Sequence, residues 1–376
     1  MGNIKFNDLS EQQKKIRPKI DAAICRVLDH GQYISGPEID TLERKLEKRL
    51  LDVNCVSCGN GTDALVLALL SLNLPPRTHV LVPSFTFAAT VEAVINANFI
   101  PIFVDIDPNS FNVCPDSVKD TIAWSKQNGL HVSAMISVDL FGLPADYLIL
   151  EEIARVSSIK LICDAAQSFG ASIEARDVGS FGDISTTSFF PTKPLACYGD
   201  GGAVFCKDNK VSNKIRSLKI HGKGDTKYDN IYVGINSRLD TIQAAILLEK
   251  LNLFDDEVEL RNDVANYYLS NIPPSLTPQK CPSNYTSVWA QFCMLATDNN
   301  HRKLILDGFY AAKIPIAIYY PVPIHTLKPY QSYQKAPKGL SVTSDVCSRI
   351  FAIPMSPYIS KIKQDYILEN LMSYCE

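Results

Sequence analysis

The chain has 376 residues, which allows either two domains or one large domain with an appendage. Its formal net charge is −3, with acidic and basic residues well mixed, so neither a nucleic-acid footprint nor a basic membrane-binding face is indicated. The N-terminal residues are polar and charged rather than apolar, and the most apolar helix-like run, residues 64–74, is too short to span a membrane. We therefore expect a cytoplasmic location.

The first two thirds of the chain alternate between helical and strand patterns. Helices are expected over residues 37–51, 61–72, 90–97, 117–127 and 147–156. Strands are expected over residues 55–58, 80–83, 100–105, 132–140, 160–163, 184–190 and 202–206. Such alternation predicts a mostly parallel sheet with helices on both faces, which is an α/β fold.

The last third of the chain has a different pattern. Residues 239–270 read as helical over a span long enough to contain a bend or two helices. Prolines at positions 273, 274, 278 and 282 then mark a change of organisation. We expect a large domain over residues 1–255 and a smaller α+β domain over residues 256–376, with the N-terminal segment packing on the smaller domain.

Eleven cysteines are scattered along the chain, and several lie within apolar stretches. An odd, dispersed set is typical of a reducing compartment rather than of a disulfide-linked fold. Cys55 and Cys58 have CxxC spacing, but no second pair and no nearby histidine complete a zinc or redox site. We expect no metal centre and interpret this stretch as a buried strand.

A lysine and an aspartate each follow an expected strand. Asp164 directly follows residues 160–163, and Lys193 lies shortly after the next strand in an otherwise uncharged run. A desolvated lysine has a lowered pKa and can hold an aldehyde as a Schiff base, while a carboxylate can keep a pyridine nitrogen protonated. Because ligands bind beyond the carboxyl ends of parallel strands, the pair predicts a pyridoxal phosphate (PLP) site. The alternatives are an exposed loop lysine and an aspartate that only caps a helix.

Other residues fit the same site. Residues 59–64 join a strand to an apolar helix, and the helix N-terminus would suit a phosphate; neither a Walker motif nor GxGxxG occurs in the chain. Ser188 could add a hydroxyl to that phosphate site. Phe87 could stack on the pyridine ring, and Gln167 could reach the phenolic oxygen of the cofactor. The alternatives are an ordinary core aromatic for Phe87 and an ordinary polar helix residue for Gln167.

Together these segments resemble the DegT/DnrJ family of PLP-dependent sugar aminotransferases. The resemblance runs from Phe6 to about Tyr358 and is carried by residues 31–38, 59–65, 83–87, 104–108, 164–168, 188–193 and 234–240. It implies an aspartate-aminotransferase-like fold, PLP fold type I. It also implies a homodimer with active sites at the subunit interface.

The resemblance also implies roles for individual residues in binding the cofactor. Lys193 corresponds to the Schiff-base lysine, Asp164 to the pyridinium partner and Gln167 to the phenolate contact. Phe87 corresponds to the stacking ring. The phosphate contacts implied in this way are Gly61, Thr62, Ser188 and, from the other subunit, Asn236.

One subgroup of the family is the most similar to this chain around residues 191–202. Its members aminate UDP-2-acetamido-2-deoxy-3-oxo-glucuronate on the way to diacetamido uronic acids of bacterial surface polysaccharides such as O-antigen. Our hypothesis for the reaction takes L-glutamate as the amino donor. Ser237 supports amination at C3, because many C4-aminating relatives carry tyrosine there.

The sugar nucleotide is expected to contact a further set of residues. Arg238 and the segment around Tyr320 correspond to sugar-nucleotide contacts, and an arginine suits a uronate carboxylate through a bidentate pair. A structural ion pair is the alternative role for Arg238. Tyr319 replaces a histidine that borders the substrate in relatives, and His325 is a further candidate for that region.

Four alternatives to this function remain open at this point. The same chemistry could act on a dTDP-3-keto-6-deoxyhexose or on a UDP-4-keto sugar. A PLP-dependent sugar dehydratase is disfavoured by Lys193, because family dehydratases carry histidine there. A PLP-binding regulator is disfavoured because no DNA-binding segment is added to the chain.

Overall fold

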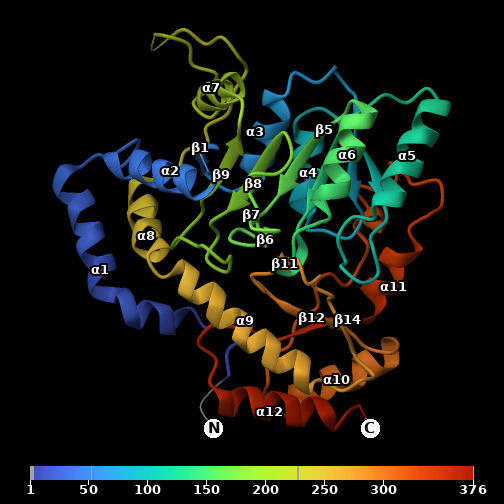
Figure 1. Ribbon diagram of the computed structural model, residues 1–376. Coiled ribbons are helices and arrows are strands. Elements are labelled where there is room, and N and C mark those ends of the chain that lie inside the picture. The colour runs from blue at the N-terminus through green and yellow to red at the C-terminus, as the bar shows by residue number, and fades with distance from the viewer. Residues whose placement is uncertain (1–3, 52, 227, 376) are drawn as a thin grey trace.

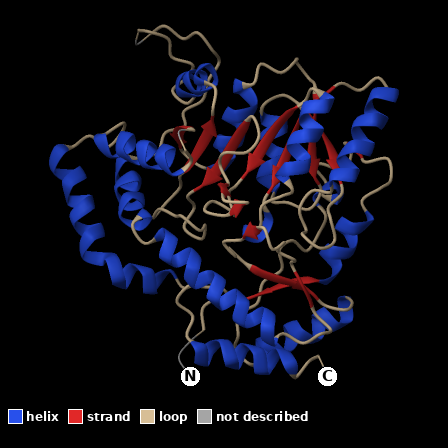
Figure 2. Ribbon diagram, viewed as in Figure 1, coloured by secondary structure: helices blue, strands red, loops and turns tan. Residues whose placement is uncertain are grey.

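The computed structural model describes residues 4–51, 53–226 and 228–375. The largest feature of these residues is an eight-stranded sheet, which lies across the upper half of Figures 1 and 2. In spatial order its strands are β1 (Asn54–Cys58), β9 (Gly202–Cys206), β8 (Ile184–Ser188), β5 (Lys160–Asp164), β4 (Val132–Val138), β2 (His79–Pro83), β3 (Ile100–Val104) and β13 (Gln334–Lys335).

Most neighbouring strands of this sheet run parallel, as predicted. From β8 through β5, β4, β2 and β3 to β13 every pair is parallel, whereas β9 is antiparallel to both β1 and β8. A parallel pair needs a long crossover connection, usually a helix. Residues 189–201 between β8 and β9 form turns and bends instead, so the chain reverses direction there.

Helices cover both faces of the sheet, which confirms the α/β prediction (Figure 2). Helices α3 (Gly61–Ser71), α4 (Ala88–Asn96) and α7 (Asn209–Leu218) pack on one face, and α2 (Pro37–Arg49), α5 (Pro115–Gln127), α6 (Tyr147–Ser157) and α8 (Thr241–Leu251) pack on the other. Successive residues of β4 show why both faces are apolar. Met135 packs toward α5 and α6, and Ile136 packs toward α3 and α4.

The N-terminal helix, α1 (Leu9–His30), packs along α8 (Figure 1). Its buried residues Ile16 and Ile20 share a small apolar cluster with Ile246 of α8. We did not predict this helix, because its narrow apolar stripe lies in an otherwise charged segment. The helical stretch predicted over residues 239–270 consists of α8 and α9 (Phe254–Asn271), which confirms that it contains two helices.

The C-terminal third forms a second layer around a three-stranded antiparallel sheet. The strands are β10 (Thr277–Pro278), β12 (Phe292–Leu295) and β14 (Ile350–Ile353), and the helices are α10 (Asn299–Ala311), α11 (Ser341–Arg349) and α12 (Lys361–Met372). Ile4 belongs to the apolar core of this layer, and the Met355 N–H donates to the Phe6 carbonyl at 3.2 Å. The expected domain boundary at residue 255 stays a prediction.

The remaining elements are short. A small sheet consists of β6 (Ser172–Ile173), β7 (Arg176–Asp177) and β11 (Tyr285–Thr286), and two 3-10 turns are η1 (Leu140–Gly142) and η2 (Ile324–Thr326). All eleven cysteines have free thiols. Within the described ranges, no helix is long and apolar enough to cross a membrane, and no three His, Cys, Asp or Glu side chains are grouped as metal ligands.

Candidate active site

A cavity of about 640 Å³ lies beyond the carboxyl ends of β2, β5 and β8, where a ligand was expected. It brings together nine of the predicted site residues: Gly61, Thr62, Phe87, Asp164, Gln167, Ser188, Lys193, Tyr319 and Tyr320. These residues are far apart in sequence. The topology of the parallel strands, whose carboxyl ends share one edge, places most of them together.

Lys193 and Asp164 influence each other across this cavity. Burial lowers the pKa of Lys193, and the charge of Asp164 opposes that shift. Burial likewise raises the pKa of Asp164, and an N–H donated from Ala166 at 3.0 Å and the charge of Lys193 oppose that shift. A desolvated amine beside a desolvated carboxyl is the arrangement that nucleophilic attack on an aldehyde and retention of a pyridinium proton require.

The loop that carries Lys193 is held by hydrogen bonds at the backbone. The Lys193 N–H donates to the Phe190 carbonyl at 2.9 Å, and Asn7 Nδ2 donates to the Thr192 carbonyl at 3.4 Å. The second contact joins the N-terminal segment to the loop. The backbone next to the reactive lysine is therefore in contact with a residue far upstream in the chain.

The first turn of α3 forms a cradle for an anion. The cap residue Asn60 accepts from the Asp63 N–H at 2.8 Å, while the N–H groups of Gly61 and Thr62 have no intrahelical acceptor. A Cβ added to Gly61 would lie 2.7 Å from the Ser188 Cβ, so only glycine lets the helix approach Ser188 this closely. Backbone donors, the positive end of the helix dipole and a hydroxyl thus face the cavity, and this donor set suits a phosphate.

The carboxamide of Gln167 is fixed at both ends. Its Oε1 accepts from the Phe141 N–H at 2.8 Å, and its Nε2 donates to the Tyr320 hydroxyl at 3.3 Å. The Tyr320 ring lies 6.4 Å from the Phe87 ring between centroids. Phe87 is 59% exposed although it borders a cavity, which leaves its ring free to pack against a planar ligand.

Asp139 contacts the backbone of Asp164 without lining the cavity, and it was not predicted as a site residue. Its N–H donates to the Asp164 carbonyl at 3.1 Å, and its carboxyl accepts from Ser168, Tyr147 and the Ala145 N–H. Burial raises the pKa of Asp139 to about 7. Its position at a strand end, like that of Asp164, was the signal that could have found it.

Further lining residues were also missed by sequence reasoning. They are Asn60, Asp63, Leu65, Thr86, Ala89, Thr90, Val138, Ala166, Phe190, Thr192, Asp200 and Gln291. Five of them lie within α3, α4 and β4, and the others lie in turns and loops. The pattern of strands and helices carries little information about which of these side chains faces a cavity.

Three predicted residues are not among those that line the cavity. His325 is buried, and its Nδ1 lies 2.6 Å from the Ser84 hydroxyl. Asn236 is exposed and Arg238 is half-buried. The intervening Ser237 accepts from the Gly59 N–H at 2.9 Å, so this segment lies behind the phosphate cradle. The predicted contacts of Asn236, Arg238 and His325 stay predictions.

Comparison with known proteins gives a consistent result across nearly the whole chain. Residues 14–372 match the DegT/DnrJ/EryC1/StrS aminotransferase family. The chain is 41% identical to UDP-2-acetamido-2-deoxy-3-oxo-D-glucuronate aminotransferase from Pseudomonas aeruginosa, over 95% of this chain and 96% of the relative.

Two solved structures extend the comparison to the fold. A DegT DnrJ EryC1 StrS aminotransferase from Brucella abortus has a TM-score of 0.96 and 42% identity, over 99% of each chain. NtdA from Bacillus subtilis with bound cofactor PMP has a TM-score of 0.90 and 25% identity, over 100% of this chain and 86% of that chain.

Proposed function

Because this chain belongs to the DegT/DnrJ/EryC1/StrS aminotransferase family and is a PLP-dependent aminotransferase of PLP fold type I, we propose that it transfers the amino group of L-glutamate to a 3-keto sugar nucleotide. The proposed acceptor is UDP-2-acetamido-2-deoxy-3-oxo-D-glucuronate, a precursor of bacterial surface polysaccharides such as O-antigen. The observation that carries this choice is the identity of 41% to a relative named for that activity, over nearly the full length of both chains. A cytoplasmic location stays a prediction.

PLP, when bound, supplies an aldehyde that links to amines and a ring that accepts an electron pair from the carbon next to the nitrogen. Lys193 Nζ would hold the aldehyde, and its lowered pKa increases the fraction of neutral, nucleophilic amine. When an amino acid takes its place on the cofactor, the same Nζ would accept the proton of the amino acid's α-carbon and deliver it to the carbon that carried the aldehyde. Asp164 would keep a proton on the ring nitrogen.

The other lining residues would hold and orient the cofactor. The N–H groups of Gly61 and Thr62 and the hydroxyl of Ser188 would bind the phosphate. Phe87 would cover one face of the ring, and Gln167 would contact the phenolic oxygen through its Nε2. Because the Gln167 Oε1 already accepts from Phe141, only the N–H side of that carboxamide is free to serve an anionic oxygen.

The acceptor sugar would enter from the side of the C-terminal third. Tyr319 and Tyr320 line the cavity there, and their hydroxyls would contact the sugar. Arg238 does not line the cavity within one copy of the chain; in the proposed complex it would bind the uronate carboxylate, and His325 would support the region of Tyr319 through the Ser84 contact.

We propose that two copies of this chain form a homodimer with shared active sites. The described residues between α7 and α8 include a loop that extends away from the rest of the chain in Figure 1. It presents three apolar side chains to solvent, Ile231, Tyr232 and Val233, and Val233 is 96% exposed. Burial of these side chains on a second copy would bring the exposed Asn236 toward the phosphate cradle of the partner.

The proposal is tested by separating the two halves of the reaction. The purified protein is loaded with PLP, and its visible absorption spectrum is recorded before and after addition of L-glutamate. We expect the cofactor band to bleach with glutamate and to return when the UDP-3-keto-uronate is added. If the band does not respond to glutamate, L-glutamate is not the amino donor. If the band returns only with a dTDP-3-keto-6-deoxyhexose or a UDP-4-keto sugar, that sugar is the acceptor instead.

A further inference from the structure

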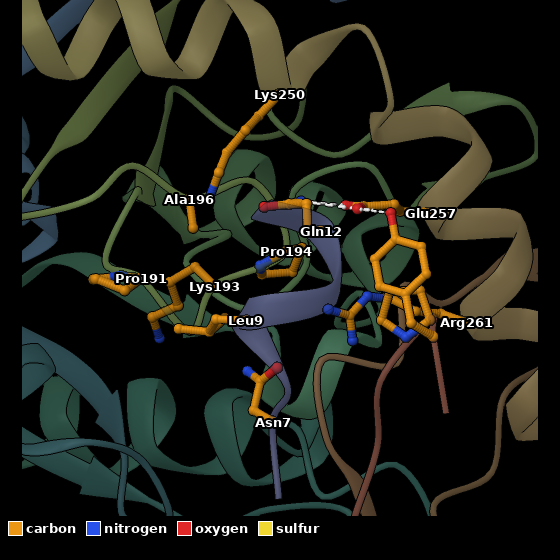
Figure 3. A pocket seen from close by; sticks show the side chains of 12 residues that line it. Asn7, Leu9, Gln12, Pro191, Lys193, Pro194, Ala196, Lys250, Glu257 and Arg261 are labelled. Carbon is orange, nitrogen blue, oxygen red and sulfur yellow. Dashed lines mark hydrogen bonds between the residues drawn. The ribbon is translucent and has the colours of Figure 1, made fainter. Parts of the chain in front are cut away.

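The loop that carries Lys193 and the turn formed by residues 164–168 are held by different parts of the chain. A small hollow borders the Lys193 loop, and Figure 3 shows Asn7 and Gln12, from the N-terminal part of the chain, beside it. No residue of the turn lines this hollow. The turn, which carries two of the residues expected to bind the cofactor, is therefore positioned by other contacts.

A buried loop that follows β4 contacts this turn at three places. The Asp139 N–H donates to the Asp164 carbonyl at 3.1 Å, and the Phe141 N–H donates to Gln167 Oε1 at 2.8 Å. The third contact is the Ser168 hydroxyl, which donates to Asp139 Oδ2 at 2.5 Å. The loop thus holds both ends of the turn and the carboxamide between them.

The carboxylate of Asp139 both closes this loop and ties it to the turn. Its Oδ1 accepts from the Ala145 N–H at 2.8 Å and from the Tyr147 hydroxyl at 2.5 Å, whereas its Oδ2 accepts from Ser168. Asp139, Tyr147 and Ser168 are all buried. Removing the carboxylate would therefore leave buried donors without a partner.

The direction of the Phe141 N–H depends on the shape of the loop. Phe141 has a φ of +65°, in the left-handed region that a residue with a Cβ adopts only where its surroundings favour it. Asn112 Oδ1 accepts from the neighbouring Leu140 N–H at 2.8 Å. Asp139 and Asn112 together hold a buried conformation in which the Phe141 N–H points at Gln167.

We propose that Asp139 is a positioning residue for the cofactor: its carboxylate fixes the turn so that Asp164 faces the ring nitrogen and Gln167 presents its Nε2 to the phenolic oxygen. Asp139 does not line the main cavity, so it acts through the turn and does not touch the cofactor. The inference rests on the cofactor contacts proposed above for Asp164 and Gln167. It is independent of the amino donor and of the sugar.

The pH titration of the visible absorption band of the PLP-loaded protein tests this role without any substrate. A hydrogen bond donated to the phenolic oxygen weakens the hold of that oxygen on the proton of the nitrogen that links the cofactor to Lys193. Ser168→Ala removes only the hydroxyl that ties the turn to Asp139 and changes no charge. We expect the midpoint of the titration to move upward by about 0.3–1 pH unit, the effect of weakening one neutral hydrogen bond.

Two variants of Asp139 give an internal comparison, because both remove the same charge. In Asp139→Asn the amide can still donate to the Ser168 hydroxyl and accept from Ala145 and Tyr147, whereas Asp139→Ala loses all of these contacts. The midpoint should therefore be higher in Asp139→Ala than in Asp139→Asn. Ser137→Ala is the control, because it removes another buried hydroxyl of the same region that makes no hydrogen bond to the described residues, and it should leave the midpoint unchanged.

Gln167→Leu distinguishes failure of this inference from failure of the proposed cofactor contact. If Gln167→Leu moves the midpoint upward while Ser168→Ala only lowers the Tm, Asp139 has a structural role alone and the proposal is overturned. If Gln167→Leu also leaves the midpoint unchanged, the proposed contact of Gln167 is wrong and the positioning role is overturned with it. Should Asp139→Ala not fold, Ser168→Ala and Gln167→Leu decide the question.

Discussion

The hydroxyl of Tyr320 accepts a 3.3 Å hydrogen bond from Nε2 of Gln167, whose Oε1 is bound to the Phe141 N–H. This contact joins the C-terminal third of the chain to the turn that follows β5 and Asp164. It lies on the wall of the main cavity, so the acceptor side and the cofactor side of the proposed site are linked by one hydrogen bond. The orientation of Gln167 is therefore sensitive to Tyr320.

Removing only the hydroxyl of Tyr320 tests this link. In Tyr320→Phe the ring keeps its packing on Phe85, 5.8 Å away between centroids, while Gln167 loses one partner. We expect kcat/KM for aminotransfer to fall about three- to tenfold, since a neutral hydrogen bond contributes about 0.5–1.5 kcal/mol. Tyr330→Phe is the control, because its hydroxyl donates to Glu92 away from the cavity and its loss should leave kcat/KM unchanged. An unaltered kcat/KM in Tyr320→Phe would contradict the link.

Replacing the buried amine separates catalysis from stability. Lys193→Met should abolish multiple turnover, because no amine then attaches the cofactor or moves the proton. The pKa of Lys193 is lowered in the folded protein, so the unfolded chain binds more protons and wild-type stability rises with pH toward 10.5. We therefore expect the cofactor-free variant to be at least as stable as wild type near pH 7, with the difference narrowing as pH rises. Urea unfolding at several pH values measures this. Turnover that persists in Lys193→Met would refute the assignment.

A single methyl group added at Gly61 tests the phosphate cradle. In Gly61→Ala the new Cβ would lie 2.7 Å from the Ser188 Cβ, so α3 and β8 must separate. Overpacking of this kind costs about 1–3 kcal/mol, and we expect PLP affinity to fall about 10- to 100-fold in an absorbance titration. Gly339→Ala is a suitable control. It is strained by its φ of +82° but has open space around it, so it should lower stability without changing PLP affinity.

Sequence patterns predicted the structure best where the chain alternates regularly between helices and strands. The strands that end at Asp164 and near Lys193 were recognised because apolar runs stop at polar residues, and the parallel topology then brings their ends together. Helix α1 was missed because its buried stripe is narrow and Pro18 lies within it. The reversal at β9 was not predicted, since periodicity does not record strand direction.

Sequence patterns were less informative about the individual residues of the candidate active site. Asp139 could have been recognised from its position directly after β4, whereas Gln291 borders the cavity from a loop, and no local pattern distinguishes it from other polar residues. His325 was predicted as a further candidate for the region of Tyr319, but whether it faces the substrate or Ser84 depends on how its segment folds over β2. The directions of individual side chains in loops could therefore not be predicted from the sequence.

The exposed apolar segment offers a test of the proposed dimer. Val233→Asp places a charge where a second copy would bury an apolar side chain, which is costly without a partner. We expect sedimentation to show dissociation at micromolar concentration, together with loss of activity. Val156→Asp changes another exposed valine, on α6, and should leave the association state unaltered. A wild-type protein that sediments as a monomer would rule out the dimer.

The buried carboxyl of Asp139 predicts a pH-dependent contribution to stability. Burial raises its pKa from 3.8 to about 7, so the folded state binds more protons than the unfolded chain between these values. Its contribution is then fully present below pH 3.8 and is lost as pH rises through about 7. Asp139→Asn cannot titrate but keeps one oxygen for the Ala145 N–H and the Tyr147 hydroxyl. We therefore expect wild type to lose stability relative to Asp139→Asn between about pH 4 and pH 7, as measured by urea unfolding of the cofactor-free proteins. A stability difference that is constant over this range would mean that the three donors keep the carboxyl ionised despite its burial.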